Sequence, residues 1–401
     1  MVRFCRAASA PSMEQSATSN WRNLIAACAA ITVFGLAFGM TYPLLSLILE
    51  SRGVSTDMIG INSAMMPIGI LLFSSVIPIA TRRFGARKVA IAAALATSLL
   101  ILSYKAFDTL AAWFVLRLLQ GMSISTLFVL SEAWIVGFAG SGHRGKIVAI
   151  YGSILSASFG AGPALVGWIG IEGWTPFVLG SIVILLGVIP LTLVEEENTV
   201  RPEETQASGI IEFAPKAPML LAAVGAFAIF DAATLSLLPV YGLRTGLDIT
   251  TAALALTALI TGNMILQFPV GWLADKFPHR LVLAGCALTT SIAVLALPLV
   301  MATVWMWPVL VIAGATGYGV YTVSLTSLGD RFKGHELVNG SASFAVMWGV
   351  GALFGSVAGG WAMAGFGPHG LPILVSIIYA LLVVGLVVRT RRLDSEQPSR
   401  A

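Results

Sequence analysis

The chain has 401 residues, of which 57% are hydrophobic and only 10% are Asp, Glu, Lys or Arg. A water-soluble domain carries roughly 25% charged residues, so this chain has too few to cover a soluble surface. Its mean hydropathy of +0.90 also indicates a chain that is too apolar for a water-soluble protein. The composition excludes soluble enzymes, secreted disulfide scaffolds and disordered chains. The net charge of +4 raises the question of nucleic-acid binding, which the positions of the basic residues decide.

Apolar runs follow one another along the whole chain, and about 20 apolar residues suffice for a helix to cross a bilayer. The first half contains runs at 23–49, 58–81, 88–104, 110–138, 146–168 and 174–194. The second half contains runs at 217–243, 250–274, 281–299, 304–329, 338–363 and 369–389. Helices are expected because every backbone polar group must be satisfied within the segment. The sequence therefore predicts an all-α membrane protein with twelve transmembrane helices.

The basic residues indicate the orientation of these helices. With the N-terminus in the cytoplasm, the inner segments hold 19 of the 23 Lys and Arg residues. The outer loops hold only Arg52, Lys105 and Arg244, while Arg117 lies inside a span. Cytoplasmic loops of membrane proteins are enriched in Lys and Arg, so both termini are predicted to be cytoplasmic. The positive charge is thereby explained, and no nucleic-acid partner is expected.

The two halves of the chain repeat one another at a shift of 193 residues. Eight positions, namely Phe84, Arg87, Val89, Ala94, Leu95, Thr97, Ser98 and Leu102, recur as Phe277, Arg280, Val282, Ala287, Leu288, Thr290, Ser291 and Leu295. Between the halves lies a charged segment containing Glu195, Glu196 and Glu197. The expected organisation is a cytoplasmic tail (1–22), a six-helix bundle (23–194), a cytoplasmic linker (195–216), a second six-helix bundle (217–389) and a cytoplasmic tail (390–401). Such pseudo-symmetric parallel halves are typical of major facilitators.

Three motifs carry a resemblance to the major facilitator superfamily. The run Gly271-Trp-Leu-Ala-Asp275-Lys276-Phe-Pro-His-Arg280 resembles the family's loop motif, with Pro278 in place of a glycine. The first-half equivalent keeps Arg83, Gly85 and Arg87 but has Arg82 at the family's aspartate position. In the fourth span, Arg117-x-x-Gln120-Gly121 resembles the arginine motif associated with proton-coupled members.

Within this superfamily the chain most resembles the YcaD-like group of bacterial transporters. The similarity includes Glu132 followed after eleven residues by Arg144-Gly145, the run from Gln267 to Phe277, and Gly314-x-x-Gly317-Tyr-x-x-Tyr321. The resemblance implies that Glu132 forms an ion pair with basic residues around Arg83, Arg87 and Arg144. Such a pair would open and close with the transport cycle. The implied gating and loop charge network is Glu132, Arg83, Gly85, Arg87, Arg144, Gly271, Asp275, Lys276 and Arg280.

Three ionisable residues lie well inside spans, where an unpaired charge is costly and therefore a candidate for function. Arg117, with Gln120, is expected to bind an anionic group or modulate a proton carrier. Its alternative role is that of a structural arginine bonded to carbonyls of a neighbouring helix. Glu132 is assigned either to a structural or gating role or to direct proton carriage. Asp231, about 14 residues into the seventh span, is either the proton-coupling site or a helix-packing carboxylate.

Further polar and aromatic residues are candidates for lining a central cavity: Tyr42, Asn62, Asn263, Gln267, Tyr318, Tyr321 and Trp348. Each of them can instead serve helix packing through a helix–helix hydrogen bond. Glycines at 160, 162 and 167 partly resemble an antiporter motif, and those at 351, 355 and 359 are four residues apart. Both sets predict close helix approach. A mainly apolar pocket with few polar anchors favours amphipathic organic substrates.

The leading hypothesis is a secondary active transporter that works by alternating access and exports small amphipathic organic compounds by proton antiport. The alternatives are a proton symporter or facilitator for uptake of a small polar metabolite, and a non-transporting receptor or assembly factor with the same fold. Phosphate-binding loops and GxSxG or HExxH motifs are missing, so neither an enzyme, a cofactor nor a metal is expected. The expected partners are the substrate, protons and the lipid bilayer, for a monomer in a bacterial inner membrane.

Overall fold

The computed structural model describes residues 13–138, 144–193 and 212–395, and the regular structure within these ranges is entirely helical. The first half consists of α1 (Met13–Ser51), α2 (Thr56–Ser74), α3 (Ile77–Phe84), α4 (Ala86–Ala106), α5 (Leu110–Phe138), α6 (Arg144–Ile169) and α7 (Thr175–Leu191). The second half consists of α9 (Pro218–Arg244), α10 (Ile249–Lys276), α11 (His279–Val300), α12 (Met306–Arg331), α13 (His335–Phe366) and α14 (Gly370–Ser395).

Eleven of the described helices are long and apolar enough to cross a membrane, rather than the twelve expected. The difference is α7, which is apolar but has 17 residues, whereas a longer run at 174–194 was predicted. Pro190 lies in its last turn, and the helix ends one residue later. A helix of this length is at the lower limit for crossing the hydrocarbon core.

The expected second span, 58–81, is divided into two helices. α2 ends at Ser74, and the short helix α3 carries Pro78 in its first turn, where proline is tolerated because its missing N–H would have no helical partner. Gly85 then separates α3 from α4 with a φ of +86°, a backbone conformation that favours glycine. The basic cluster around Arg83 therefore sits on a short helix before the third span.

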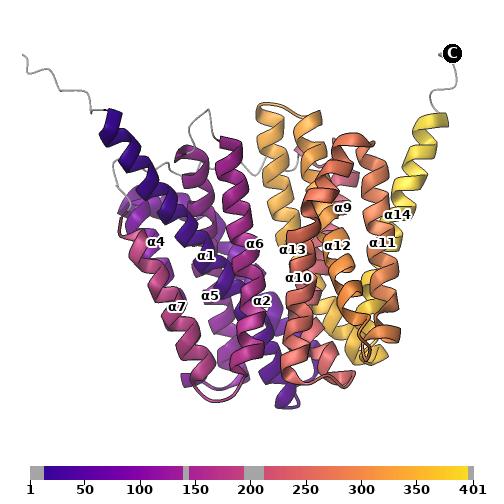
Figure 1. Cartoon of the computed structure of the whole chain (residues 1–401), viewed down its shortest axis with the longest axis horizontal. Helices are drawn as coiled ribbons and strands as arrows, with labels where there is room; N and C mark the ends of the chain where they lie inside the picture. Colours follow the sequence, from indigo (N-terminus) through magenta and orange to yellow (C-terminus); the bar gives the residue numbers. More distant parts are fainter. Residues whose placement is uncertain (1–12, 139–143, 194–211, 396–401) are drawn as a thin grey trace, which may run out of the picture.

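The two terminal helices are longer than the expected spans. α1 begins at Met13, inside the predicted tail 1–22, and α14 continues to Ser395, inside the predicted tail 390–401. Most of the predicted linker, from 194 to 211, lies outside the described residues. The start of α1 and the end of α14 lie at the same end of the molecule, on opposite sides of it (Figure 1).

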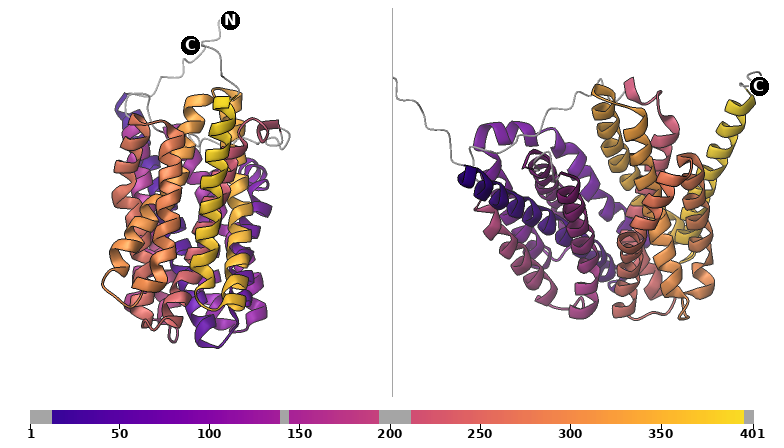
Figure 2. Two further views of the ribbon diagram at one scale, coloured as in Figure 1. Left: turned by 90° about the vertical axis from the view of Figure 1, so that its right-hand side faces the viewer. Right: turned by 45° about the horizontal axis from the view of Figure 1, so that its top comes forward.

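The helices of each half lie mainly beside one another, with the first half on the left and the second on the right of Figure 1. Two pairs make the main contacts between the halves: α2 packs on α13, and α6 packs on α10. α1 and α9 also touch. The side view in Figure 2 (left) shows the helices upright with α14 toward the viewer, and the tipped view (right) shows α14 at the edge of the second half.

Both halves use the same helix contacts at the repeat interval of 193. In the first half, a Cβ added to Gly69 or Gly121 would collide with the backbone of Leu118 or Met66, which brings α2 and α5 together. The corresponding glycines of α10 and α12 are Gly262 and Gly314, and they meet Val311 and Leu259 at the equivalent positions. The repeat detected over a short stretch of sequence therefore extends to the packing of the central helices.

Buried hydroxyl pairs follow the same repeat. Thr97 and Ser123 are 2.8 Å apart at their hydroxyl oxygens, and so are their counterparts Thr290 and Thr316. The next residue in each case, Ser98 or Ser291, bonds a serine on the last helix of its half. These pairs give polar side chains inside an apolar helix a partner on the adjacent helix.

The halves meet closely at the end formed by loops 52–55, 107–109, 170–174, 245–248, 301–305 and 367–369, here called the outer end. A Cβ on Gly60 of α2 would collide with the carbonyl oxygen of Ser356 on α13, and a Cβ on Gly360 would collide with that of Thr56. On the other side, Gly167 of α6 lies against Thr250 of α10. The opposite end, which carries the start of α1, is called the inner end.

Candidate transport site

Asp231 of α9 is buried, with 4% of its surface exposed, and binds two side chains from other helices. The hydroxyl of Tyr318 on α12 donates to Oδ1 at 2.7 Å, and the indole Nε1 of Trp348 on α13 donates to Oδ2 at 3.3 Å. All three residues are cavity or coupling candidates from the sequence, and the fold brings them together. Asp231 is the one buried carboxylate among the described residues, and no basic group there lies within ion-pair distance of it.

Two aromatic rings pack against Tyr318, which binds this carboxylate. Phe227 and Phe230, one turn apart on α9, each pack against the ring of Tyr318, with centroids 5.5 and 5.8 Å apart. The geometry is edge-on in both pairs, which is a favoured arrangement for aromatic rings. The tyrosine that binds the carboxylate is therefore packed among aromatic rings, an environment that suits an apolar or cationic group.

Arg117 of α5 is fully buried in the first half. Its Nη1 donates to the hydroxyl of Ser63 at 2.6 Å, and its Nη2 donates to the carbonyl oxygen of Thr41 at 3.3 Å. Its Nε is buried without a hydrogen-bond partner. The bond to a backbone carbonyl of α1 is of the kind expected for a structural arginine, while a role in anion binding stays a prediction.

Gln120 lies on the same helix one turn further on and extends this polar network. Its Nε2 donates to the hydroxyl of Thr41 at 3.4 Å, and its Oε1 accepts from the hydroxyl of Tyr104 at 2.7 Å. The indole of Trp113 donates to the backbone carbonyl of Tyr104. Sequence reasoning paired Arg117 with Gln120 but missed Ser63, Thr41 and Tyr104, whose short or aromatic side chains look like ordinary packing residues in an apolar run.

A row of three aromatic rings joins the two buried charges. The Arg117 guanidinium lies 4.9 Å from the ring centre of Tyr42, whose ring lies 4.8 Å from that of Phe38. Phe38 of α1 then lies 6.3 Å from Trp348 of α13, which binds Asp231. The row crosses from the first half of the chain to the second.

The remaining cavity candidates divide into two groups. Asn62 is fully buried beside Ser63, and both its side-chain atoms lack a hydrogen-bond partner. Tyr321 packs its ring against Phe227 at 4.9 Å, close to the Asp231 cluster. Asn263 of α10 is half-buried and Gln267 of the same helix is exposed, and neither has a hydrogen bond to another described side chain. They do not join the central cluster.

Glu132 makes no ion pair or hydrogen bond with a described residue, and its side chain is exposed. The structure thus does not bring it against Arg83 or Arg87, both of which lie near α3 at the inner end. The side chain of Arg144 lies outside the described ones. The neighbouring Ser131 is buried instead and shares a hydrogen bond of 2.8 Å with Tyr151 of α6.

The second-half loop motif lies at the inner end of α10. Asp275 is exposed and has no ion pair within the described ranges, while the Lys276 ammonium lies 4.1 Å from the ring centre of Trp272. A Cβ on Gly271 would meet nothing within 4 Å. Arg280, at the start of α11, lines a pocket with other basic residues.

An ion pair that the sequence did not suggest joins the two halves at the outer end. Arg244 at the end of α9 binds Glu50 near the end of α1 with two hydrogen bonds of 2.7 and 3.0 Å. Arg52 pairs with Asp108 nearby within the first half. Within the described ranges, no group of three or more His, Cys, Asp and Glu side chains is placed to hold a metal ion.

The comparisons with known proteins identify the family. The model of the Major Facilitator Superfamily matches residues 27–321 and 244–401. The chain belongs to this superfamily. It is 27% identical to the uncharacterized MFS-type transporter YfkF of Bacillus subtilis over 372 residues, covering 89% of this chain and 93% of that one. It is 25% identical to the MFS-type transporter YcaD of an Escherichia coli strain over 280 residues, covering 68% and 72%. The predicted family is thereby confirmed, and the chain is a membrane transporter and not an enzyme.

Solved structures show the same fold at low sequence identity. A bacterial homologue of the human lysosomal transporter Spinster, in an inward-facing and unoccupied conformation, matches with a TM-score of 0.75 at 13% identity over 98% of this chain and all of that one. The nucleoside transporter NupG matches with a TM-score of 0.71 at 11% identity over 91% and 99%. These likenesses establish an MFS-like arrangement of helices.

Proposed function

We propose that the chain is a proton-coupled antiporter that exports small amphipathic organic compounds, with Asp231 as the group that exchanges protons. Transport proceeds by alternating access, in which the halves 23–194 and 217–389 move against each other around the central cluster. The linker 195–216 and both tails face the cytoplasm in this proposal, and the protein resides as a monomer in a bacterial inner membrane. The positions of the basic residues and the bacterial relatives support that location.

The single observation behind the proposal is the setting of Asp231. A buried carboxylate inside a membrane is tolerated only if it is neutralised by a partner or a proton. The described structure supplies two hydrogen-bond donors, Tyr318 and Trp348, but no cation. A proton is the remaining way to neutralise the group when the site closes. Release of that proton at the other side of the membrane couples the transport cycle to the gradient.

The surroundings of Asp231 also favour one class of substrate. Tyr318 and Trp348 bind the carboxylate, and the rings of Phe227 and Phe230 pack against Tyr318. A protonated amine or quaternary ammonium group gains from the carboxylate and from nearby aromatic faces, while the apolar part of the molecule gains from the rings. We therefore assign amphipathic organic cations as substrates, which compete with the proton for the same carboxylate.

The experiment is proton flux in proteoliposomes that contain the purified full-length chain and an internal pH dye. A panel of amphipathic cations, including tetraphenylphosphonium and ethidium, is added with and without an imposed pH gradient. An antiporter moves protons opposite to the cation. A symporter moves protons with the substrate, a facilitator runs without a gradient, and a receptor shows no flux of either kind.

Two substitutions locate the coupling group. Asp231→Asn should abolish gradient-driven transport, because the amide keeps the shape but cannot exchange a proton. Facilitated exchange of substrate should continue only at a higher substrate concentration, because the cation loses the carboxylate that binds it. Tyr318→Phe should weaken gradient-driven transport, because it removes a donor to the charged carboxylate that is worth about 1.5–3 kcal/mol. Tyr379→Phe is the matched control, since that hydroxyl donates to the carbonyl of Gly317 at 3.2 Å and not to Asp231. Unchanged gradient dependence in Asp231→Asn rules the proposal out.

A further inference from the structure

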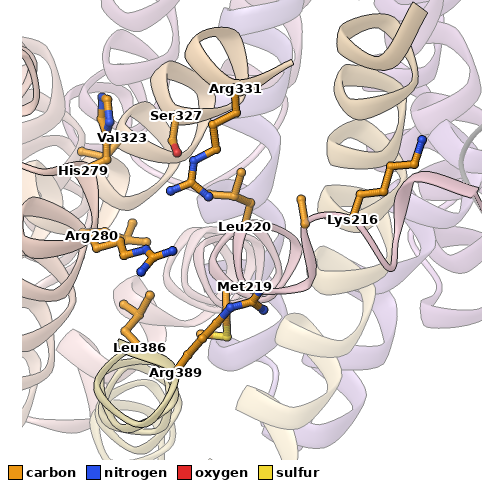
Figure 3. A pocket seen from close by; sticks show the side chains of 12 residues that line it. Lys216, Met219, Leu220, His279, Arg280, Val323, Ser327, Arg331, Leu386 and Arg389 are labelled. Carbon is orange, nitrogen blue, oxygen red and sulfur yellow. The ribbon is translucent and has the colours of Figure 1, made fainter. Parts of the chain in front are cut away.

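A pocket lies at the inner end of the second half, away from the Asp231 cluster. It is bounded by the ends of α9, α11, α12 and α14. Its charged lining residues are all basic: Lys216, His279, Arg280, Arg331 and Arg389. No Asp or Glu is among the residues that line it. Figure 3 shows the guanidinium ends of Arg280, Arg331 and Arg389 directed into the same space.

The basic residues differ in whether a carboxylate already neutralises them. The Lys216 ammonium lies 2.7 Å from Glu336 and points away from the three arginines (Figure 3). His279 lies 3.4 Å from Asp330. For the three arginines, no carboxylate in the described part of the chain lies within ion-pair distance. Converging like charges repel one another, so an anion between them relieves the repulsion.

A buried hydroxyl adds a second indication of a ligand. Ser327 of α12 lines the pocket with only 2% of its surface exposed, and its Oγ has no hydrogen-bond partner. A buried hydroxyl without a partner is unfavourable. An oxygen of an anion held by the arginines would give it one. The pocket thus combines three guanidinium groups, which bind phosphate by paired hydrogen bonds, with an additional neutral donor.

The rest of the lining is apolar and belongs to the membrane-spanning helices. Ala217, Met219, Leu220, Leu283, Val323 and Leu386 form this part. A ligand that fills both parts carries a phosphate next to a hydrocarbon region. Anionic phospholipids have this combination, and basic pockets between helices on the cytoplasmic side suit their head groups.

We infer that this pocket binds a phosphate group, and that its apolar lining favours the head group of an anionic phospholipid over a free phosphate compound. Arg280, Arg331 and Arg389 hold the phosphate oxygens, and Ser327 donates to one of them. The ligand joins α11, α12 and α14 at one end of the second half. This inference concerns a lipid or phosphate site and does not depend on the direction or coupling of transport.

The test is binding to the delipidated full-length chain in detergent, measured by calorimetry and by native mass spectrometry. The probes are dioctanoyl phosphatidylglycerol, dioctanoyl phosphatidylcholine and inorganic phosphate. Arg331→Gln combined with Arg389→Gln should weaken phosphatidylglycerol binding by about ten-fold or more, because two of the three guanidinium groups that hold the phosphate are lost. Lys88→Gln combined with Lys333→Gln removes the same charge at the inner end outside the pocket and should change binding by less than about two-fold.

The outcomes separate the two ligand sources. Preference for phosphatidylglycerol over phosphatidylcholine, without competition from inorganic phosphate, supports a lipid site. Inorganic phosphate that binds the wild type but not the arginine variant supports the phosphate site with a soluble ligand. Equal weakening by both double variants, or no binding of either anionic probe, overturns the inference. Arg331→Lys combined with Arg389→Lys keeps the charge and should retain part of the binding, which excludes misfolding as the cause of a loss.

Discussion

Arg244 forms a bidentate ion pair with Glu50: Nε donates to Oε1 at 2.7 Å, and Nη2 donates to Oε2 at 3.0 Å. The pair spans the two halves of the chain at the outer end, where α2 also packs closely on α13. Both side chains are less than a third exposed, at 29% and 15%. Arginine matches a carboxylate well in this geometry. The pair therefore stabilises the arrangement in which the outer end is closed.

The first prediction concerns this pair. Glu50→Gln should raise the population of a state open at the outer end about five-fold, because a pair of this kind contributes about 1 kcal/mol. Spectroscopic labels on the loops 170–174 and 301–305, which belong to different halves, measure the opening as a longer distance. Glu172→Gln is the control, because Glu172 is exposed at the same end and pairs with no described residue. If the distance between the labelled loops is the same in Glu50→Gln and Glu172→Gln, the ion pair does not hold the two halves together at the outer end.

The second prediction is a pH dependence of stability. Partial burial tends to raise the pKa of Asp108, but hydrogen bonds and charges from Arg52 and Lys105 outweigh it and hold that pKa below the usual value. A lowered pKa in the folded state means that the stabilisation is present above the ordinary pKa of an aspartate and is lost as the pH falls through the folded value. Since the side chain is 38% exposed, the contribution is no more than about 1 kcal/mol.

The measurement for Asp108 is the Tm of the wild type and of Asp108→Asn across pH 7 to pH 3. The wild type should have the higher Tm at pH 7, and the difference should shrink below about pH 4, where the aspartate becomes protonated. Glu172→Gln should show no comparable difference at any pH. A gap between wild type and Asp108→Asn that stays constant down to the lowest pH contradicts the expected linkage.

The third prediction tests the contact between α2 and α13. Gly60→Ala places a methyl group against the carbonyl oxygen of Ser356 and should lower stability by about 1–3 kcal/mol, the usual cost of overpacking. The loss appears as a lower Tm of the purified protein in detergent. Gly285→Ala is the matched control, because a Cβ there meets nothing within 4 Å. If both variants melt at the wild-type temperature, the helices do not approach as closely as described.

The fourth prediction concerns the buried arginine. Arg117→Lys keeps the charge but cannot bond Ser63 and the Thr41 carbonyl at once, because an ammonium lacks the planar fork of a guanidinium. Substrate flux should fall by about ten-fold, the equivalent of one charged hydrogen bond. Lys333→Arg, at an exposed lysine between α12 and α13, should leave flux near the wild-type level. Equal flux for Arg117→Lys and the wild type would leave the network without a role in transport.

Much of the fold could be predicted because a bilayer leaves few choices. Apolar runs located the helices to within a few residues in most cases, since a span must satisfy its own backbone and match the hydrocarbon thickness. The misplaced boundaries have local causes. Pro190 lies in the last turn of the short helix α7, and α3 is divided from α2 before Pro78. A hydropathy average over many residues does not detect a helix end or a helix break of this kind.

The central cluster could be predicted only in part. Asp231, Tyr318 and Trp348 stood out because a charge or an indole deep in an apolar run is unusual. That they bind one another could not be read from the sequence, since they come from three different helices. The suggested pairing of Glu132 with Arg83 and Arg87 rested on resemblance, and the described structure shows no such contact.

The sequence by itself determined that this chain spans a membrane, repeats one half in the other and belongs to a transporter family, because composition, charge asymmetry and motifs are properties of the order of residues. Only the tertiary structure decided which polar groups meet. Glu50 and Arg244 are 194 residues apart, and the arginines of the inner pocket come from three helices. Residues so far apart along the chain become neighbours only through the packing of the helices against one another. The order of apolar and polar residues along a single helix does not encode that packing.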